Sequence, residues 1–357
     1  MKIFKILLLV LVLFPLTVFT SYADNAGYYT DNAKSIVEKE GIDFEQIKKS
    51  PLDYLFDAAK KSALKGLENR FSDFSKILAV MLITSVVNLF ALNENTNITK
   101  TVNMVSVVAV FGIAVSGFSA QAESVSRNMI DIKNFMIAFM PAFAGISFAS
   151  GEMITSTVYT GFFLISIISV ANFCISYILP SINIFMAAGV TSSVSSVINM
   201  KQLCNFYSKA VKTAMTAAVS VLCFMLSVQT TITQAQDTLA VRTGKLLVTS
   251  SVPVIGDVLQ GAVGSVYTSM GVLKSFFGIA GITVTVGIFL PGIVALAVKW
   301  AEYYLLASIG SMLGNKSAAE LLMCFKDVAE IMLSMLVLFM VLLVFSLSIM
   351  IKLMQGV

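Results

Sequence analysis

The residues able to do chemistry are few in this chain, and they stand apart from one another. The sequence of 357 residues has no histidine, so it lacks the commonest general base near neutral pH and the commonest ligand of transition metals. Its four cysteines are isolated and show no C-x-x-C spacing, which favours small buried side chains over metal ligands or a disulfide. We find no nucleotide-binding, zinc-protease or nucleophile-elbow motif. The sequence therefore predicts no enzyme activity, no metal and no cofactor.

Charged residues inside long apolar runs are the nearest candidates for a functional polar site. Asp257 lies within the apolar region 252–272, and Lys274 closes that region. A charge buried in lipid is costly and is a functional hypothesis in itself. The alternative is that Asp257 caps or kinks a broken helix, or that both residues lie at membrane interfaces.

Two further pairs of charges are close in the sequence. Lys299 and Glu302 are three residues apart on one predicted helix face, where they can pair. Asp327 and Glu330 stand at the start of the last apolar run. Anchoring at the membrane interface explains both pairs.

Glycine and proline mark the places where membrane helices can be broken. Glycines recur through residues 256–287, where they allow either close helix packing or a broken helix of the kind found in channels and transporters. The candidate gate or broken-helix positions are Pro141, Gly145, Pro253, Gly256, Asp257, Gly261, Gly264, Lys274 and Pro291.

The composition places these residues in a membrane protein. Hydrophobic residues make up 57% of the chain and charged residues only 12%, about half the share in soluble proteins. The mean hydropathy is +0.88. The net charge of +4 is spread thinly, with no basic run typical of nucleic-acid binding. These values predict an all-α polytopic bundle in a lipid bilayer and no nucleic-acid partner.

The N-terminal residues resemble a signal peptide. Lys2 and Lys5 precede the apolar run 6–19, and small residues before Asp24 predict cleavage after Ala23. An uncleaved signal anchor is the alternative, but the run is short for a bilayer of ~30 Å. Either way, the following residues start on the non-cytoplasmic side of the membrane.

Three regions follow from this reading: a signal peptide (1–23), an extracytoplasmic region (24–75) and a multi-span membrane domain (76–357). Residues 52–74 of the second region have the spacing of an amphipathic helix, which lies on the membrane surface or docks on the bundle.

The membrane domain contains apolar runs sufficient for about six to eight spans, some of them broken or re-entrant. The segment 182–198 is rich in small residues and is either a packing helix or a re-entrant half-span. Polar stretches at 121–133 and 229–251 divide the runs. The runs are 77–92, 102–120, 135–148, 154–179, 182–198, 214–228, 252–272, 276–298 and 331–351.

Three features of the chain resemble the stage III sporulation protein AE family. The first is the order of signal peptide, short charged region with an amphipathic helix, and multi-span domain. The second is the proline-containing segment Phe139–Gly145. The third and most specific is Arg242–Lys245 followed by Ser250–Asp257, which is similar to the family's stretch before its glycine-rich region.

The resemblance implies a role in spore formation. It implies a non-enzymatic component of a secretion-like channel between mother cell and forespore, needed for forespore development after engulfment. The implied partners are the other stage III A sporulation proteins and, through them, stage II sporulation protein Q. The implied location is the mother-cell-derived membrane around the forespore. A self-contained secondary transporter is the alternative, and it requires polar groups near the bilayer midplane.

Overall fold

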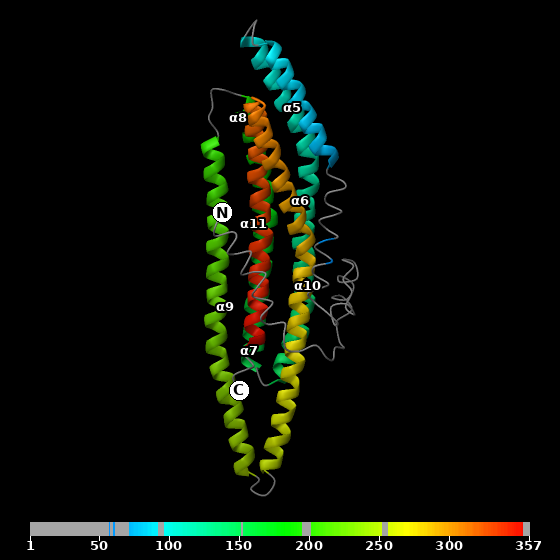
Figure 1. The fold of residues 1–357 in the computed structure, drawn as a ribbon. Coiled ribbons are helices and arrows are strands. Elements are labelled where there is room, and N and C mark those ends of the chain that lie inside the picture. Colours follow the sequence, from blue (N-terminus) through cyan, green and yellow to red (C-terminus); the bar gives the residue numbers. More distant parts are fainter. Residues whose placement is uncertain are drawn as a thin grey trace.

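The computed structural model describes residues 71–91, 96–150, 153–194, 201–251 and 256–352, together with Asp57 and Lys60. Within these ranges every regular element is a helix, as Figure 1 shows, so the all-α prediction is confirmed. Six helical stretches are long and apolar enough to cross a membrane. The predicted signal peptide and most of the region 24–75 lie outside the described residues. The helices are α5 (Phe71–Ala91), α6 (Thr96–Ala149), α7 (Met153–Phe173), the π-helix η1 (Cys174–Ile178), α8 (Leu179–Val194), α9 (Lys201–Ser251), α10 (Gly256–Met312) and α11 (Lys316–Lys352).

Several predicted spans are parts of longer helices. α6 has 54 residues and joins the predicted spans 102–120 and 135–148 through the polar stretch 121–133. At ~1.5 Å per residue it is ~81 Å long, far more than the ~30 Å of a bilayer's hydrocarbon core. α9 includes the polar stretch 229–251 in the same way. The structure thus differs from the predicted division, because polar residues continue these helices instead of forming loops.

Proline does not end the helices that contain it. Pro141 lies inside α6, and Pro291 lies inside the 57-residue α10. Each proline removes one backbone donor, but membrane helices tolerate this where neighbouring groups satisfy the freed carbonyl. The helices are continuous through both positions, whose role in gating stays a prediction.

The predicted span 154–179 and residues 182–194 of the predicted segment 182–198 form one continuous helical run. Its only irregularity is η1, where the backbone N–H of Leu179 donates to the carbonyl of Cys174, five residues earlier. Pro180 follows directly and has no N–H to donate, so the usual bonding pattern cannot pass through it. A single π turn accommodates this defect without breaking the helix. Residues 182–194 are therefore the continuation of α7 through η1.

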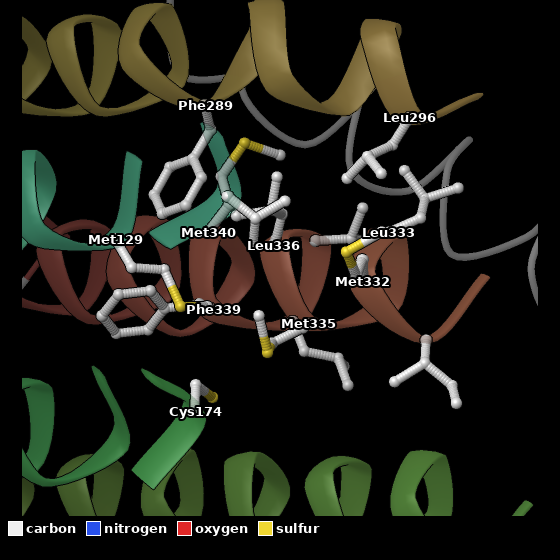
Figure 2. Close-up of a cluster of buried hydrophobic side chains, with 14 of the residues drawn as sticks. Met129, Cys174, Phe289, Leu296, Met332, Leu333, Met335, Leu336, Phe339 and Met340 are labelled. Carbon is white, nitrogen blue, oxygen red and sulfur yellow. The ribbon is translucent and has the colours of Figure 1, made fainter. Parts of the chain in front are cut away.

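α11 lies in the middle of the bundle and contacts α6, α7, α8, α9 and α10. Most side chains of its apolar part, residues 331–351, are buried, and Figure 2 shows Met335 and Phe339 among Met129, Cys174 and Phe289 from other helices. The rings of Phe289 and Phe339 meet edge to face, with centroids 5.9 Å apart. A helix that is apolar on every side is stable only in such a position.

The connection between α10 and α11 is a tight turn at Gly314. This residue has a φ of 77°, a conformation that glycine adopts without steric cost. The N–H of Asn315 donates to the carbonyl of Gly310 at 2.9 Å, which closes the end of α10. The side chain of Asn315 donates to the Ser106 hydroxyl at 3.2 Å and so ties the turn to α6. The turn sends α11 back along α10 as an antiparallel hairpin (Figure 1).

Candidate functional site

The predicted site residues do not form a cluster within the described residues. Gly256, Asp257, Gly261, Gly264 and Lys274 all lie on the helical backbone of α10, which begins at Gly256. Pro253 lies outside the described residues.

Several glycines of α10 that were not among the predicted gate positions make close helix contacts, Gly281 and Gly278 among them. A Cβ atom added at Gly281 would lie 2.6 Å from the ring of Phe139 on α6. One added at Gly278 would meet the side chain of Ile351 on α11. Gly145, by contrast, faces open space, with no atom within 4 Å of an added Cβ. Glycine in this part of α10 therefore permits tight helix packing.

The first polar cluster joins α10 to α5. Lys299 Nζ lies 2.9 Å from Glu302 Oε2 and 3.9 Å from Asp73 Oδ2. The side chains of Lys299 and Glu302 are only 6% and 7% exposed, so the pair is buried inside the bundle. Lys76, one turn along α5, lies 3.9 Å from Asp73 and balances the charge. The predicted pairing of Lys299 with Glu302 is confirmed, and its deep burial is the new finding.

Aromatic rings and a small residue enclose this first cluster. Lys299 Nζ lies 5.4 Å from the centre of the Tyr303 ring, within the range of a cation–π contact. Gly117 of α6 leaves room for the pair, since a Cβ added there would lie 3.3 Å from Asp73 Oδ2 and 3.6 Å from Lys299 Nζ. Among the described residues, Glu302 Oε1 and Trp300 Nε1 have no hydrogen-bond partner.

The second polar cluster joins α11 to α9. Glu330 accepts from Lys212 of α9 through Oε1 and from Lys326 through Oε2, both at 2.9 Å. Lys326 also lies 2.9 Å from Asp327. Two lysines thus balance two carboxylates, and all four side chains are between 17% and 33% exposed. Glu330 therefore ties α11 to α9, while Asp327 pairs with Lys326 of its own helix. The interfacial anchoring predicted for both acids stays a prediction.

Both clusters lie at one level of the bundle. Tyr303 follows Glu302 on α10, and its ring contacts that of Phe325, next to Lys326 on α11, at 5.5 Å. We call this level the charged layer. It consists of Asp73, Lys76, Lys212, Lys299, Glu302, Lys326, Asp327 and Glu330.

The charged layer lies between two apolar parts of the bundle. The apolar runs 276–298 of α10 and 331–351 of α11 lie on one side of it, and the run 77–92 of α5 lies on the other. Within the layer, the buried pair of Lys299 and Glu302 is stable only while both partners are present, and removing one of them costs about 3–5 kcal/mol. The layer therefore fixes α5 and α9 to the central hairpin at defined positions.

A third polar contact lies at the opposite end of the bundle. Asp237 of α9 is 4% exposed and accepts from the backbone N–H of Ile154 at 2.8 Å. Ile154 is in the first turn of α7, where the N–H groups have no partner within the helix. A carboxylate there also complements the positive end of the helix dipole. Asp237 thus caps α7 from another helix, a long-range contact that the sequence pattern does not reveal.

The chemistry available at these sites is ion pairing and hydrogen bonding. The part of the chain that the structure describes contains no group of histidine, cysteine and acidic residues able to hold a metal ion. Tyr159 of α7 donates to the carbonyl of Ser346 on α11 at 2.8 Å, inside the apolar core. These contacts hold the helices together at fixed heights.

Comparison with known proteins gives one result. The family model described as "Stage III sporulation protein AE" matches residues 32–354, nearly the whole chain. No curated protein and no solved structure gave a match.

Proposed function

Because the chain belongs to the stage III sporulation protein AE family, we propose that it is a non-enzymatic membrane component of a channel complex between mother cell and forespore. Its partners in this proposal are the other stage III A sporulation proteins and, through them, stage II sporulation protein Q. It would act in the membrane around the forespore and support forespore development after engulfment. The family match over residues 32–354 is the observation that carries the proposal.

The structure supports this proposal in two ways. Six membrane-length helices give the chain the form of an integral membrane protein. The charged layer and the cap at Asp237 fix α5, α7 and α9 around α11. A component of a larger assembly needs such a fixed arrangement to keep its shape. The absence of histidine from the chain also favours a scaffold or gate over a catalyst.

Affinity capture from sporulating cells tests the proposal. A tagged copy of the chain should co-purify with other stage III A proteins from detergent-solubilised membranes. A tagged polytopic protein of unrelated family, taken from the same cells, is the control and should capture none of them. Capture of no stage III A protein, with the chain abundant in the membrane, would contradict the proposal.

One observation favours a secondary transporter as a second candidate. Glu302 is 8% exposed and lies within a membrane-length helix. A buried carboxylate in that position is typical of ion-coupled transporters. Substrate uptake by the purified chain in liposomes, lost in Glu302→Gln, would support transport over the channel component.

A further inference from the structure

The buried part of the first polar cluster holds more negative than positive charge. Glu302 and Asp73 both face Lys299 Nζ, at 2.9 Å and 3.9 Å, so two carboxylates share one buried ammonium group. Lys76 brings a second positive charge to Asp73, but its side chain is 60% exposed, and water weakens an ion pair in that position. Inside the bundle, the two carboxylates and Lys299 therefore carry one negative charge in excess.

One oxygen of Glu302 lies where a positive charge is missing. Oε2 lies beside Lys299, whereas Oε1 is buried and has no hydrogen-bond partner within the described part of the chain. A buried carboxylate oxygen without a partner is costly, and a bound cation removes that cost. The excess charge and the unpartnered oxygen thus point to the same binding site.

The cation that fits this site is a proton. Lys299 Nζ lies 2.9 Å from Oε2 and would repel a metal ion bound between the carboxylates. A metal ion also needs several ligands, and the described residues provide no such group of acidic, cysteine or histidine side chains. A proton needs a single oxygen atom and no cavity.

The charges of the neighbouring helices have partners of their own. On α6, Glu123 and Arg127 pair with each other on the exposed face. On α11 and α9, two lysines balance two carboxylates in the second polar cluster, which consists of Lys212, Lys326, Asp327 and Glu330. On α10 itself, the ring of Tyr303 lies beside Lys299 Nζ. The excess of negative charge therefore belongs to Asp73 and Glu302.

We propose that Glu302 binds a proton and that this proton switches the partner of Lys299. A proton from water binds Oε1 and forms the neutral acid, and Lys299 then pairs with Asp73 alone. Asp73 is 29% exposed and connects the cluster to water. Gly117 leaves Nζ room to move, because a Cβ added there would lie 3.3 Å from Asp73 Oδ2 and 3.6 Å from Nζ. Since Asp73 belongs to α5 and Lys299 to α10, proton binding strengthens the link between these helices.

Infrared spectroscopy of the purified chain in detergent tests the proposal. Lowering the pH from about 9 to about 4, a range in which buried carboxylates can titrate, should produce the C=O band of a buried protonated carboxyl group. Glu302→Gln keeps the shape of the side chain but cannot bind the proton, so this band should be missing. Glu330→Gln is the matched control and should keep the band, because Glu330 has two lysine partners.

Asp73→Asn tests whether the shared lysine creates the site. This change leaves Lys299 to Glu302 alone, so the pair is balanced without a proton. The band should then need at least an about tenfold higher proton concentration, because the competing negative charge has been removed. Trp300, the only tryptophan of the chain, follows Lys299 and stacks on Tyr304 at 5.9 Å. Its fluorescence should change over the same pH range as the band.

Each result supports or overturns the proposal. Equal bands in the wild type and Glu302→Gln, or no band in the wild type, would overturn the proton site. A band in Asp73→Asn at the same pH as in the wild type would overturn the sharing of Lys299, and this variant still decides if Glu302→Gln does not fold. These measurements need no partner protein, so failure of this inference and failure of the proposed function are distinguishable.

Discussion

At the residue scale, the paired charges inside the bundle should control stability. Glu302→Ala leaves Lys299 buried with only the more distant Asp73 as a counter-charge. We expect this change to lower the free energy of unfolding by about 3–5 kcal/mol, the cost of breaking a buried ion pair. The measurement is the loss of the monodisperse peak after heating the protein in detergent.

Two matched variants test the cause of that loss. Lys76→Ala removes a charge that is 60% exposed, and it should change stability by less than about 1 kcal/mol. The double change Lys299→Met with Glu302→Leu replaces the buried pair by apolar side chains and should recover most of the lost stability. Equal effects of Glu302→Ala and Lys76→Ala would contradict the burial of the pair.

The sequence predicts polar contacts within one helix far better than contacts between helices. The three-residue spacing of Lys299 and Glu302 was sufficient to predict their pairing. Nothing in the sequence links Asp73 or Lys212 to partners more than a hundred residues away, because such contacts depend on how helices are placed side by side. The sequence shows only that Asp73 and Lys212 are charged residues beside apolar runs. A charged side chain that becomes buried there needs a partner, but the sequence does not identify it.

At the element scale, the fit between α6 and α10 should depend on Gly281. Gly281→Ala puts a methyl group against the Phe139 ring, 2.6 Å away, and overpacking of this kind costs about 1–3 kcal/mol. Gly112→Ala is the matched control, because an added Cβ there meets nothing within 4 Å. It should be neutral, or stabilising by up to ~1 kcal/mol through higher helix propensity. The measurement is the thermal stability of Gly281→Ala and Gly112→Ala in detergent. Equal unfolding temperatures for the two variants would contradict the close contact at Gly281.

The turn between α10 and α11 provides a second element-scale prediction. Gly314→Ala places a Cβ in the left-handed region at a φ of 77°, which costs roughly 1–2 kcal/mol. Gly314→Asn should lose less stability than Gly314→Ala, because asparagine tolerates this conformation better than alanine. The unfolding midpoints of the two variants show which is less stable. A midpoint for Gly314→Ala equal to that of the wild type would refute the strained turn.

Helix boundaries were the least predictable property of the elements. The polar stretch 121–133 has the composition of a loop, yet it is helical, with Glu123 and Arg127 on its exposed face and Val125, Met129 and Ile132 buried. Pro180 has the signature of a helix end, yet a π turn carries the chain past it. Composition alone does not distinguish a polar loop from a helix with one polar face.

At the scale of the whole molecule, the glycine-rich start of α10 should matter for function more than for membrane insertion. Figure 1 shows the end of α9 and the start of α10 extending together beyond the ends of α7 and α11. We expect Asp257→Ala and Gly261→Leu to block sporulation after engulfment while leaving the chain in the membrane. Spore counts and membrane fractionation measure this, and normal spore yield from both variants would contradict a role for these positions in gating.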